Sequence, residues 1–381
     1  MSKPMRKRIV FFAACHNIGG FETKLDTLVR NLNPDRYEIH VLLLYPYYKA
    51  QKAPEPLRKR QRAFFRWPHV PTHEVVMKYR LDVGVIFRTA LVLKKLRPNI
   101  VIFFALGPGT FAGPLACLLA GVKCIIRMQD TVLNGLYPRI LRPLDQFLVH
   151  ATSFAIVPSF FLKNILIQGL PFSPSQVHVI PNGIDLSKFS EKNPDSELQQ
   201  AIGSHKVIGM IANLVPVKNH EMLFQAIPSI LRRFPNTHFV LVGDGPLRKK
   251  LEEEARCLGI SGCVHFLGYR SDVHRILPLF HMGVLCSHVE VHPISLIEIQ
   301  AMGIPVVAPN VGGIPEVVQD GKTGILIPAN SPESFAEAIC ELLSHPQKIS
   351  QLGKEAKAWV HREFTIDRMI RRLDAFLEGI N

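Results

Sequence analysis

Two glutamates eight residues apart, Glu290 and Glu298, carry the clearest chemistry in the sequence. Between them, Pro293 is suited to the first turn of a helix, and Gly303 is suited to its end. This spacing predicts Glu290 in the loop before the helix and Glu298 on its second turn, so that both carboxylates flank the helix N-terminus. Free N–H groups at such an end bind phosphate, and a carboxylate accepts two hydrogen bonds from a diol. We therefore interpret the segment as a site for a diphosphate, with one carboxylate on sugar hydroxyls and the other on a ribose diol.

A purely structural explanation of the same glutamates is an acidic residue that favours the helix dipole, followed by an exposed helical glutamate. Glu298, however, lies between Ile297 and Ile299, and its neighbours are apolar. A buried carboxylate needs a partner. The sequence therefore favours the functional interpretation.

Other candidate binding residues follow apolar runs that we expect to be strands. Lys218 lies near a helix start, where a cation is unfavourable unless a phosphate binds there; a solvated loop lysine is the alternative. Asn213 precedes Lys218 in the same loop. Tyr269 and Arg270 follow the apolar run Val264–Phe266 and could line a base pocket. The turn Val242–Pro246 is most simply structural.

Gly19 and Gly20 follow the first apolar run and open a helix. Glycines there permit positive φ and let a ligand approach the backbone, although a tight strand-to-helix turn explains them equally well. The segment is not GxGxxG, which disfavours a nicotinamide site.

The elements that position these residues are short apolar runs alternating with amphipathic helical segments. Most runs are continuously apolar, which is typical of parallel strands covered on both faces. They predict an α/β protein with two successive Rossmann-like domains, 1–183 and 184–364, joined at the turn Ile180–Asp185. Ligands of such sheets bind at the carboxyl ends of the strands. The predicted strands are Ile9–Ala14, Ile39–Leu44, Ile100–Phe104, Cys124–Arg127, Ser153–Val157, Val177–Ile180, Val207–Ile211, His238–Val242, Val264–Phe266, Gly283–Cys286, Pro305–Ala308 and Gly324–Ile327.

Composition bounds the function. The 381 residues include seven cysteines without a CxxC or Cys/His cluster, so neither a zinc site nor a disulfide framework is expected, and a cytoplasmic location is the default. The uncharged segment Pro98–Val122 is long enough to span a bilayer. Glycine and proline interrupt it, so we expect a buried strand, a loop and a helix instead.

The net charge of +14 belongs wholly to the first half: up to Asp185 there are 25 Lys+Arg and 10 Asp+Glu, and after it 20 and 21. A field of one sign on one domain predicts an anionic partner, which could be a membrane surface, a phosphorylated acceptor or nucleic acid, or else a solvated basic face. The segment Arg58–Trp67 mixes cations with aromatic residues and favours a membrane interface. No nucleic-acid-binding motif is present, so no specific nucleic acid is expected.

The chain resembles the retaining GT-B glycosyltransferases of family 4. Glu290–Glu298 matches the family's Glu-x7-Glu signature, and Ala301–Ala308 and Gly312–Val318 match the motifs that follow it. Gly19–Glu22, Ile180–Asp185, Val242–Pro246 and Phe266–Gly268 also occur in the family's order. The resemblance covers essentially the whole chain and is most specific over Val207–Pro328.

The resemblance implies a cleft between two Rossmann-like domains that binds a nucleotide-diphosphate sugar, transfer with retention and no essential metal or other cofactor. By analogy Glu298 holds the ribose and Glu290 the sugar. Lys218 and the amides of Pro293, Ile294, Ser295 and Leu296 would stabilise the leaving diphosphate, while Gly19 and Gly20 close over the phosphates. A final helix within 365–381 would cross back to the first domain.

Two departures from the family pattern matter. Asn213 stands where many members have arginine, so one cation for the diphosphate is missing. Many members also have a sugar-contacting histidine after the fourth strand; here Gln129 and Asp130 are nearest that position, and Arg127 could restore positive charge. The expected activity is transfer to a lipid-linked or envelope-glycan acceptor at the cytoplasmic face of a membrane. A GT-B nucleotide-sugar 2-epimerase and a non-catalytic basic binding protein are the alternatives.

Overall fold

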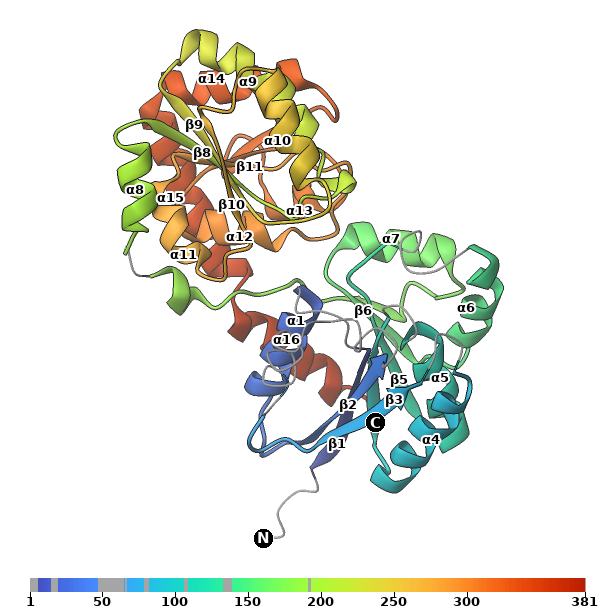
Figure 1. Cartoon of the computed structure of the whole chain (residues 1–381). Coiled ribbons are helices and arrows are strands. Elements are labelled where there is room, and N and C mark those ends of the chain that lie inside the picture. The colour runs from blue at the N-terminus through green and yellow to red at the C-terminus, as the bar shows by residue number, and fades with distance from the viewer. Residues whose placement is uncertain are drawn as a thin grey trace. The chain divides into compact units, whose positions relative to one another are not determined.

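The computed structural model describes residues 6–14, 20–46, 65, 67–78, 82–105, 109–132, 139–190 and 193–380. The chain divides into two compact units, which are drawn in Figure 1. Unit 1 comprises Met1–Pro181 and Met369–Asn381, and unit 2 comprises Asn182–Arg368. The division falls within the Pro-Asn-Gly segment at 181–183. Only glycine fits at position 183, because a Cβ there would lie 2.3 Å from the carbonyl oxygen of Thr365.

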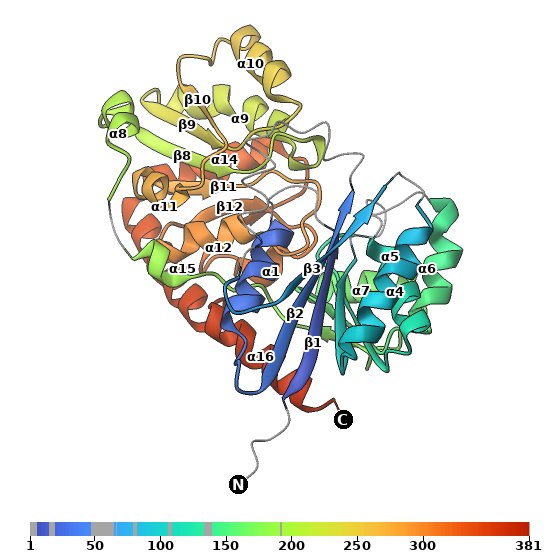
Figure 2. The ribbon, with the colours of Figure 1, turned by 60° about the horizontal axis from the view of Figure 1, so that its bottom comes forward.

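Unit 1 is built on a seven-stranded parallel sheet with the strand order β3-β2-β1-β4-β5-β6-β7. Its elements are β1 (Lys7–Ala14), α1 (Gly20–Asn31), β2 (Tyr37–Pro46), β3 (Thr72–Met77), α4 (Gly84–Leu96), β4 (Ile100–Phe104), α5 (Gly109–Ala120), β5 (Cys124–Met128), α6 (Arg142–Val149), β6 (Phe154–Val157), α7 (Phe160–Gly169) and β7 (Val177–Val179), with a 3-10 turn η2 (Arg139–Leu141) before α6. The order reverses direction at β1, and right-handed crossovers therefore place helices on both faces. Helices α4, α5 and α6 cover one face, and α1 and α16 (Ile366–Glu378) lie on the other (Figure 2).

Unit 2 is built on a six-stranded parallel sheet with the order β10-β9-β8-β11-β12-β13. Its strands are β8 (Lys206–Ile211), β9 (Thr237–Val242), β10 (Val264–Gly268), β11 (Met282–Val284), β12 (Val306–Pro309) and β13 (Gly324–Ile327). Its helices are α8 (Ser196–Ile202), α9 (His220–Arg233), α10 (Arg248–Cys257), α11 (Val273–Ile276), α12 (Ile294–Ala301), α13 (Ile314–Val317), α14 (Pro332–Ser344) and α15 (Pro346–Glu363), with 3-10 turns η3 (Leu186–Phe189), η4 (Pro216–Lys218) and η5 (Leu277–Leu279). The predicted α/β class with two Rossmann-like parallel sheets is confirmed.

The last helix returns to unit 1, as expected. The Lys7 ammonium at the start of β1 donates hydrogen bonds to the carbonyl oxygens of Leu377 (3.2 Å) and Ile380 (2.5 Å). The Phe376 ring packs edge-on against Phe154 of β6, with the ring centroids 5.4 Å apart. A segment more than 180 residues downstream therefore completes the first unit.

The uncharged segment 98–122 folds as β4 and α5, the predicted strand and helix. Helix α5 begins at Gly109, earlier than expected, and keeps Pro114 inside it. No helix in the described part of the chain is both long enough and apolar enough to cross a membrane.

Two expectations for the first half were wrong. The strand β3 was missed, because it lies at the sheet edge and its sequence THEVVM exposes alternate positions. The aromatic residues of the cationic segment Arg58–Trp67 were expected at a membrane interface, yet Phe65 and Trp67 are buried. The Trp67 indole N–H donates to Asp26 of α1 at 2.8 Å, so this ring anchors the chain to its own core. Arg58–Phe64 and Arg66 lie outside the described residues.

Candidate active site

The candidate site of unit 2 lies at the carboxyl ends of three neighbouring strands, β8, β11 and β12. The chain leaves β8 towards β9 on one side, whereas β11 continues to β12 on the other. This reversal is a topological switch point, where open parallel sheets bind ligands. The loop after β8 carries Lys218, and the loop after β11 carries Ser287 and Glu290. The sheet therefore brings together residues separated by about seventy positions in the sequence.

The carboxylate of Glu290 is held by two side chains that donate hydrogen bonds to the same oxygen. The Lys218 ammonium donates to Oε1 at 2.5 Å, and the Ser287 hydroxyl donates to the same atom at 2.6 Å. The pair is partly buried, with 23% of the Lys218 side chain and 11% of the Glu290 side chain exposed. No hydrogen bond from the described residues reaches Oε2, so this atom is available to accept one from a ligand.

The backbone of Glu290 is held by a glycine pair after β12. Gly313 N–H donates to the Glu290 carbonyl oxygen at 2.8 Å. Gly312 has φ +57°, and a Cβ on it would lie 2.2 Å from that same oxygen. Only glycine fits both the left-handed conformation and this close approach. The Gly312–Gly313 pair therefore sets the position of the Glu290 loop.

Helix α12 begins directly after this loop. Pro293, expected in the first turn, is instead the N-cap with extended backbone, and the helix begins at Ile294. The Leu296 N–H turns back to the Pro293 carbonyl at 3.2 Å. The N–H groups of Ile294 and Ser295 have no acceptor among the described residues. They are the free donors that a helix N-terminus offers to an anion.

Glu298 lies on the second turn of α12, as predicted, and is half-buried. Burial raises the pKa of its carboxyl from 4.5 to about 7, and the Lys188 ammonium opposes this only in part. No hydrogen bond or ion pair joins Glu298 to another described residue. A ligand that donates hydrogen bonds to this carboxylate would stabilise its charged form.

The remaining predicted residues of unit 2 fall into two groups. Asn213 is exposed at the carboxyl end of β8, and Tyr269 is exposed after β10. Arg270 is engaged by two carboxylates, Asp195 at 2.6 Å and Asp272 at 2.7 Å, which raise its pKa. These ion pairs give Arg270 a structural role that the sequence did not predict.

The turn Val242–Pro246 packs closely against the loop after β8. A Cβ on Gly243 would lie 2.0 Å from the Ala212 carbonyl oxygen, and one on Gly245 would lie 2.4 Å from that of Leu214. The two glycines let this turn pack against the loop that carries Asn213.

In unit 1 the candidates lie at the carboxyl ends of β1 and β5. Gly19 is outside the described residues, and Gly20 is the first residue of α1. Asp130 accepts a hydrogen bond from the Lys24 ammonium of α1 at 2.7 Å. Gln129 is buried: its Oε1 accepts from the Arg127 guanidinium at 2.7 Å, and its Nε2 donates to the Thr131 carbonyl at 2.8 Å.

Arg127 does not supply free positive charge. Its guanidinium is almost fully buried and binds both oxygens of Asp145 on α6, at 2.6 and 3.1 Å. The pair joins β5 to α6 and cancels its own charge. The expectation that Arg127 replaces the missing diphosphate cation is therefore wrong.

Sequence reasoning assigned no role to Ser287, Gly312, Gly313 or Lys24. The double glycine was visible as a motif, but its contact with Glu290 depends on the pairing of β11 with β12. Lys24 is on α1, and nothing in the sequence indicated that Asp130 is its carboxylate partner. Within the described ranges, no group of three His, Cys, Asp or Glu side chains could hold a metal ion.

Two family models match the chain. The family model described as "Glycosyltransferase Family 4" matches residues 18–188, and that described as "Glycosyl transferases group 1" matches residues 193–359. Together they span both units. The chain belongs to glycosyltransferase family 4.

Similar proteins within this family act on different donors. A GDP-mannose-dependent alpha-(1-6)-phosphatidylinositol monomannoside mannosyltransferase of Mycobacterium tuberculosis is 31% identical over 224 residues, which are 55% of this chain and 57% of that protein. The chain thus matches little more than half the length of that relative. A UDP-Gal:alpha-D-GlcNAc-diphosphoundecaprenol alpha-1,3-galactosyltransferase of Escherichia coli is 27% identical over 332 residues, 84% of each chain.

Among solved structures, Anabaena HepE in complex with UDP and glucose has a TM-score of 0.83 at 20% identity and covers 98% of this chain and 100% of its own. This likeness shows that the chain has the GT-B fold.

Proposed function

We propose that this family member transfers a sugar, with retention at the anomeric carbon, from a nucleotide-diphosphate donor bound to unit 2 onto a lipid-linked or envelope-glycan acceptor. The observation that carries the proposal is the cluster of Lys218, Ser287 and Glu290 beside the α12 N-terminus at the switch point. The names of the mycobacterial and Escherichia coli relatives, which act on lipid-linked acceptors, support the acceptor class.

In this proposal, different residues of unit 2 bind the ribose, the diphosphate and the sugar of the donor. Glu298 accepts hydrogen bonds from the ribose diol, and the N–H groups of Ile294 and Ser295 face the diphosphate. Glu290 accepts from a sugar hydroxyl through Oε2, because Lys218 and Ser287 already occupy Oε1. Asn213, Tyr269 and Leu296 complete the donor side, together with Pro293 as the cap of α12.

Chemistry requires that the leaving diphosphate be stabilised as the anomeric bond breaks. The Lys218 ammonium and the helix N-terminus carry fixed positive charge at this position, and such preorganised charge acts on the transition state without reorganisation. We propose that these groups act without a metal ion, so that a chelator leaves the rate of nucleotide-diphosphate release unchanged.

In unit 1, Asp130 is the group we assign to the sugar-facing position, oriented by Lys24. Gln129 acts as a positioning residue, because both ends of its amide are used inside the protein. We propose Gly20, with Gly19, as the backbone that approaches the donor phosphates. The peripheral attachment of the enzyme to a membrane is part of this proposal.

The decisive experiment measures nucleotide-diphosphate release from a panel of UDP- and GDP-sugars with a lipid-linked acceptor. Glu290→Ala and Glu298→Ala should lower kcat/KM by at least about a hundredfold, the effect typical of removing one transition-state contact. Glu337→Ala, an exposed glutamate of α14, is the matched control. Full turnover in both site variants would disprove the assignment.

Two further outcomes would replace the proposed reaction with another. Conversion of the donor sugar to its epimer without any acceptor would identify an epimerase. Absence of NDP-sugar binding in a thermal-shift screen would leave a non-catalytic binding protein, because a ligand of the folded state raises the melting temperature. The anomeric configuration of the product, measured by NMR, tests retention.

A further inference from the structure

The outer surface of unit 1 exposes large apolar side chains on two helices of one layer. Phe87 and Leu91 of α4 are 60% and 68% exposed, and they lie four residues apart on one side of the helix. Ile140 in η2 and Phe147 of α6 are 84% and 66% exposed. Helix α5 packs between α4 and α6 on the same face of the sheet (Figure 2). We call the solvent side of α4, α5 and α6 the outer helical face.

The exposed Phe87 and Leu91 are not among the buried residues of α4. Helix α4 already packs Val85, Ala90 and Leu93 against the sheet. Its opposite side should therefore be polar in a helix at the surface of a globular protein. Apolar residues on both sides of one helix indicate a second surface that binds to the outer face.

Cations lie at the ends of the helices that form the outer helical face. Lys94 and Lys95 lie in the last turn of α4, and Arg97 follows it. Lys123 follows α5, and Arg142 begins α6. All five side chains are exposed.

The acidic residues described between 82 and 150 do not offset this charge. Asp82 and Asp145 are buried, and they pair with Arg88 and Arg127. Asp130 pairs with Lys24 at the carboxyl end of the sheet. Within the described part of α4, α5 and α6, the exposed ionised side chains are therefore all positive.

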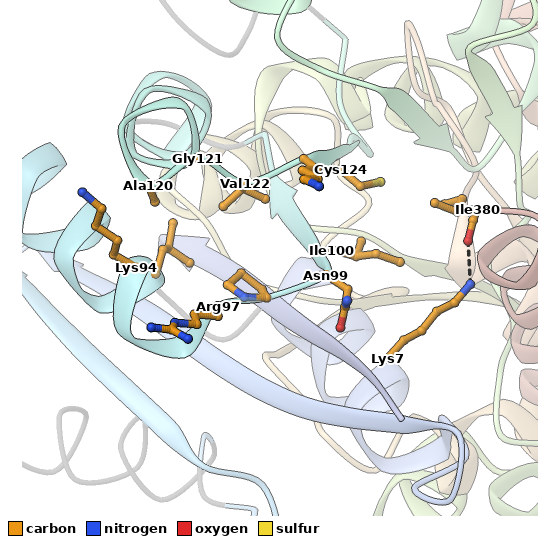
Figure 3. A pocket seen from close by; sticks show the side chains of 13 residues that line it. Lys7, Lys94, Arg97, Asn99, Ile100, Ala120, Gly121, Val122, Cys124 and Ile380 are labelled. Carbon is orange, nitrogen blue, oxygen red and sulfur yellow. Dashed lines mark hydrogen bonds between the residues drawn. The ribbon is translucent and has the colours of Figure 1, made fainter. Parts of the chain in front are cut away.

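A basic cavity adjoins this face at the amino ends of β1, β4 and β5 (Figure 3). It has a volume of about 810 Å³, and Lys7, Lys94, Arg97 and Lys123 line it. Lys7 is held by the Ile380 carbonyl, whereas Lys94, Arg97 and Lys123 are exposed. The cavity provides cations for a phosphate group at one border of the apolar surface.

We propose that the outer helical face docks unit 1 on an anionic lipid bilayer. Phe87, Leu91, Ile140 and Phe147 enter the boundary between headgroups and acyl chains, while the cations at the helix ends bind lipid phosphates. This inference deepens the proposed function, on which it rests for the reason why a bilayer would be the partner. It differs from the membrane interface expected at 58–67, whose aromatic residues Phe65 and Trp67 are buried.

Charge favours a bilayer over a second copy of the chain. A symmetric dimer formed through this face would bring the same cations of both copies together, and like charges across an interface disfavour association. An anionic lipid surface neutralises them. It also receives the apolar side chains without requiring a shape-matched pocket.

The test is sedimentation of the full chain with vesicles, and it requires no sugar donor. We expect binding to vesicles that contain phosphatidylglycerol, weaker binding at high salt, and little binding to pure phosphatidylcholine. The double variant Phe87→Ser/Leu91→Ser should bind at least about tenfold more weakly. Lys94→Glu/Lys95→Glu should lose at least about twenty-five-fold, since each cation near an anionic surface contributes about fivefold.

Matched controls lie in unit 2. Leu258→Ser replaces an apolar residue that is 42% exposed, and Lys354→Glu/Lys357→Glu reverses two exposed lysines of α15. Both should bind vesicles like the unchanged chain. Unchanged urea midpoints in all variants would show that each of them is folded.

Three outcomes would overturn the proposal: equal vesicle binding by all variants, equal binding to neutral and anionic lipid, or a concentration-dependent dimer that Phe87→Ser/Leu91→Ser dissociates. An assay of nucleotide-diphosphate release with a soluble acceptor distinguishes the proposed reaction from the proposed docking surface. The docking variants should retain this release, whereas Glu290→Ala should lose it and still bind vesicles. Loss of vesicle binding alone leaves the proposed reaction standing, and loss of turnover alone leaves the docking surface standing.

Discussion

At the scale of single residues, the ion pair with Glu290 holds the Lys218 ammonium in place before the donor binds. We expect Lys218→Met to lower kcat about a hundredfold or more, because the leaving diphosphate loses its cation. The pair is in contact at 2.5 Å, so the effects of Lys218→Met and Glu290→Gln should not add. A double-mutant cycle on kcat/KM should give a coupling of about 1–3 kcal/mol. Additive effects would show that the two residues act separately.

Glu298 makes donor binding depend on pH. Its pKa is raised to about 7 by burial, and the ribose diol binds the ionised form. We expect donor affinity to fall about tenfold for each pH unit below 7 and to level off above it. Calorimetry at pH 6 in buffers of different ionisation enthalpy should detect proton release on binding. The measurement uses an intact NDP-sugar, whose diphosphate stays ionised throughout. Glu298→Gln should bind weakly and without this pH dependence.

The same pKa shift has the opposite effect on stability. The folded state favours the neutral form of the Glu298 carboxyl. The contribution of this carboxyl to the free energy of unfolding is therefore fully present below pH 4.5 and is lost as pH rises through about 7. The difference in free energy of unfolding between the unchanged chain and Glu298→Gln should therefore change by at most about 3 kcal/mol over this range. Urea unfolding at both ends of the range measures it. A constant difference would indicate that the pKa of Glu298 is the same in the folded and the unfolded state.

Arg127 illustrates where sequence inference fails at this scale. Its position after a buried run was compatible with a ligand-binding cation, because nothing in the sequence pairs it with Asp145. That partner lies eighteen residues away on α6. By contrast, Glu290 and Glu298 could be placed correctly around a helix N-terminus, since local proline and glycine signals define that helix.

A substitution separates the structural role of Arg127 from a binding role. Arg127→Met leaves Asp145 buried without its partner and should cost about 3–5 kcal/mol in free energy of unfolding. The double variant Arg127→Met/Asp145→Leu should recover most of this loss, because no buried charge remains. Arg30→Met removes a partly exposed i,i+4 pair and should cost less than about 1 kcal/mol. Chemical denaturation measures all three.

At the scale of elements, the strands that line the candidate site were largely predictable. Each is a short run such as Val306–Ala308 that is apolar on both faces, so its pattern survives without tertiary information. The edge strand β3 was not predictable in this way. Two of its three exposed positions, Thr72 and Glu74, are polar, and its pairing with β2 depends on a partner thirty residues away in the sequence. The contact of Gly312 with Glu290 is likewise invisible in sequence, because it arises from strand pairing.

Gly312 provides a test of how the β12 loop positions Glu290. Gly312→Ala introduces a Cβ 2.2 Å from the Glu290 carbonyl oxygen and should displace the loop, with a fall in kcat of tenfold or more as an order-of-magnitude expectation. Gly259→Ala is the matched control: its φ is +68°, similar to the +57° of Gly312, but no atom lies within 4 Å of the added Cβ. Both variants should lose about 1–2 kcal/mol of stability from the backbone conformation. Equal kinetics in both would contradict the assigned role of Gly312.

At the scale of the whole molecule, removal of the last helix should affect unit 1 alone, while unit 2 keeps its binding of the nucleotide. Truncation after Thr365 removes α16, whose buried residues Met369, Ile370, Leu373 and Leu377 belong to the core of unit 1. We expect faster amide hydrogen exchange in β1 and β2 of the truncated chain. Unit 2 should keep its protection and its affinity for nucleotide. Glu378→Ala, which keeps α16 and removes its exposed ion pair with Arg36, is the control and should leave exchange unchanged.

The return of α16 also affects how the chain folds during its synthesis. When Pro181 leaves the ribosome, unit 1 has all of its strands but lacks the helix that contacts β1 and β6. At about 5–20 residues per second, translation of the next 187 residues takes roughly 10–40 s. During this interval the nascent sheet has an uncovered apolar surface, while unit 2 emerges and folds from contiguous sequence. The first unit to be made is therefore the last to be finished, and we expect a chaperone to bind its nascent form.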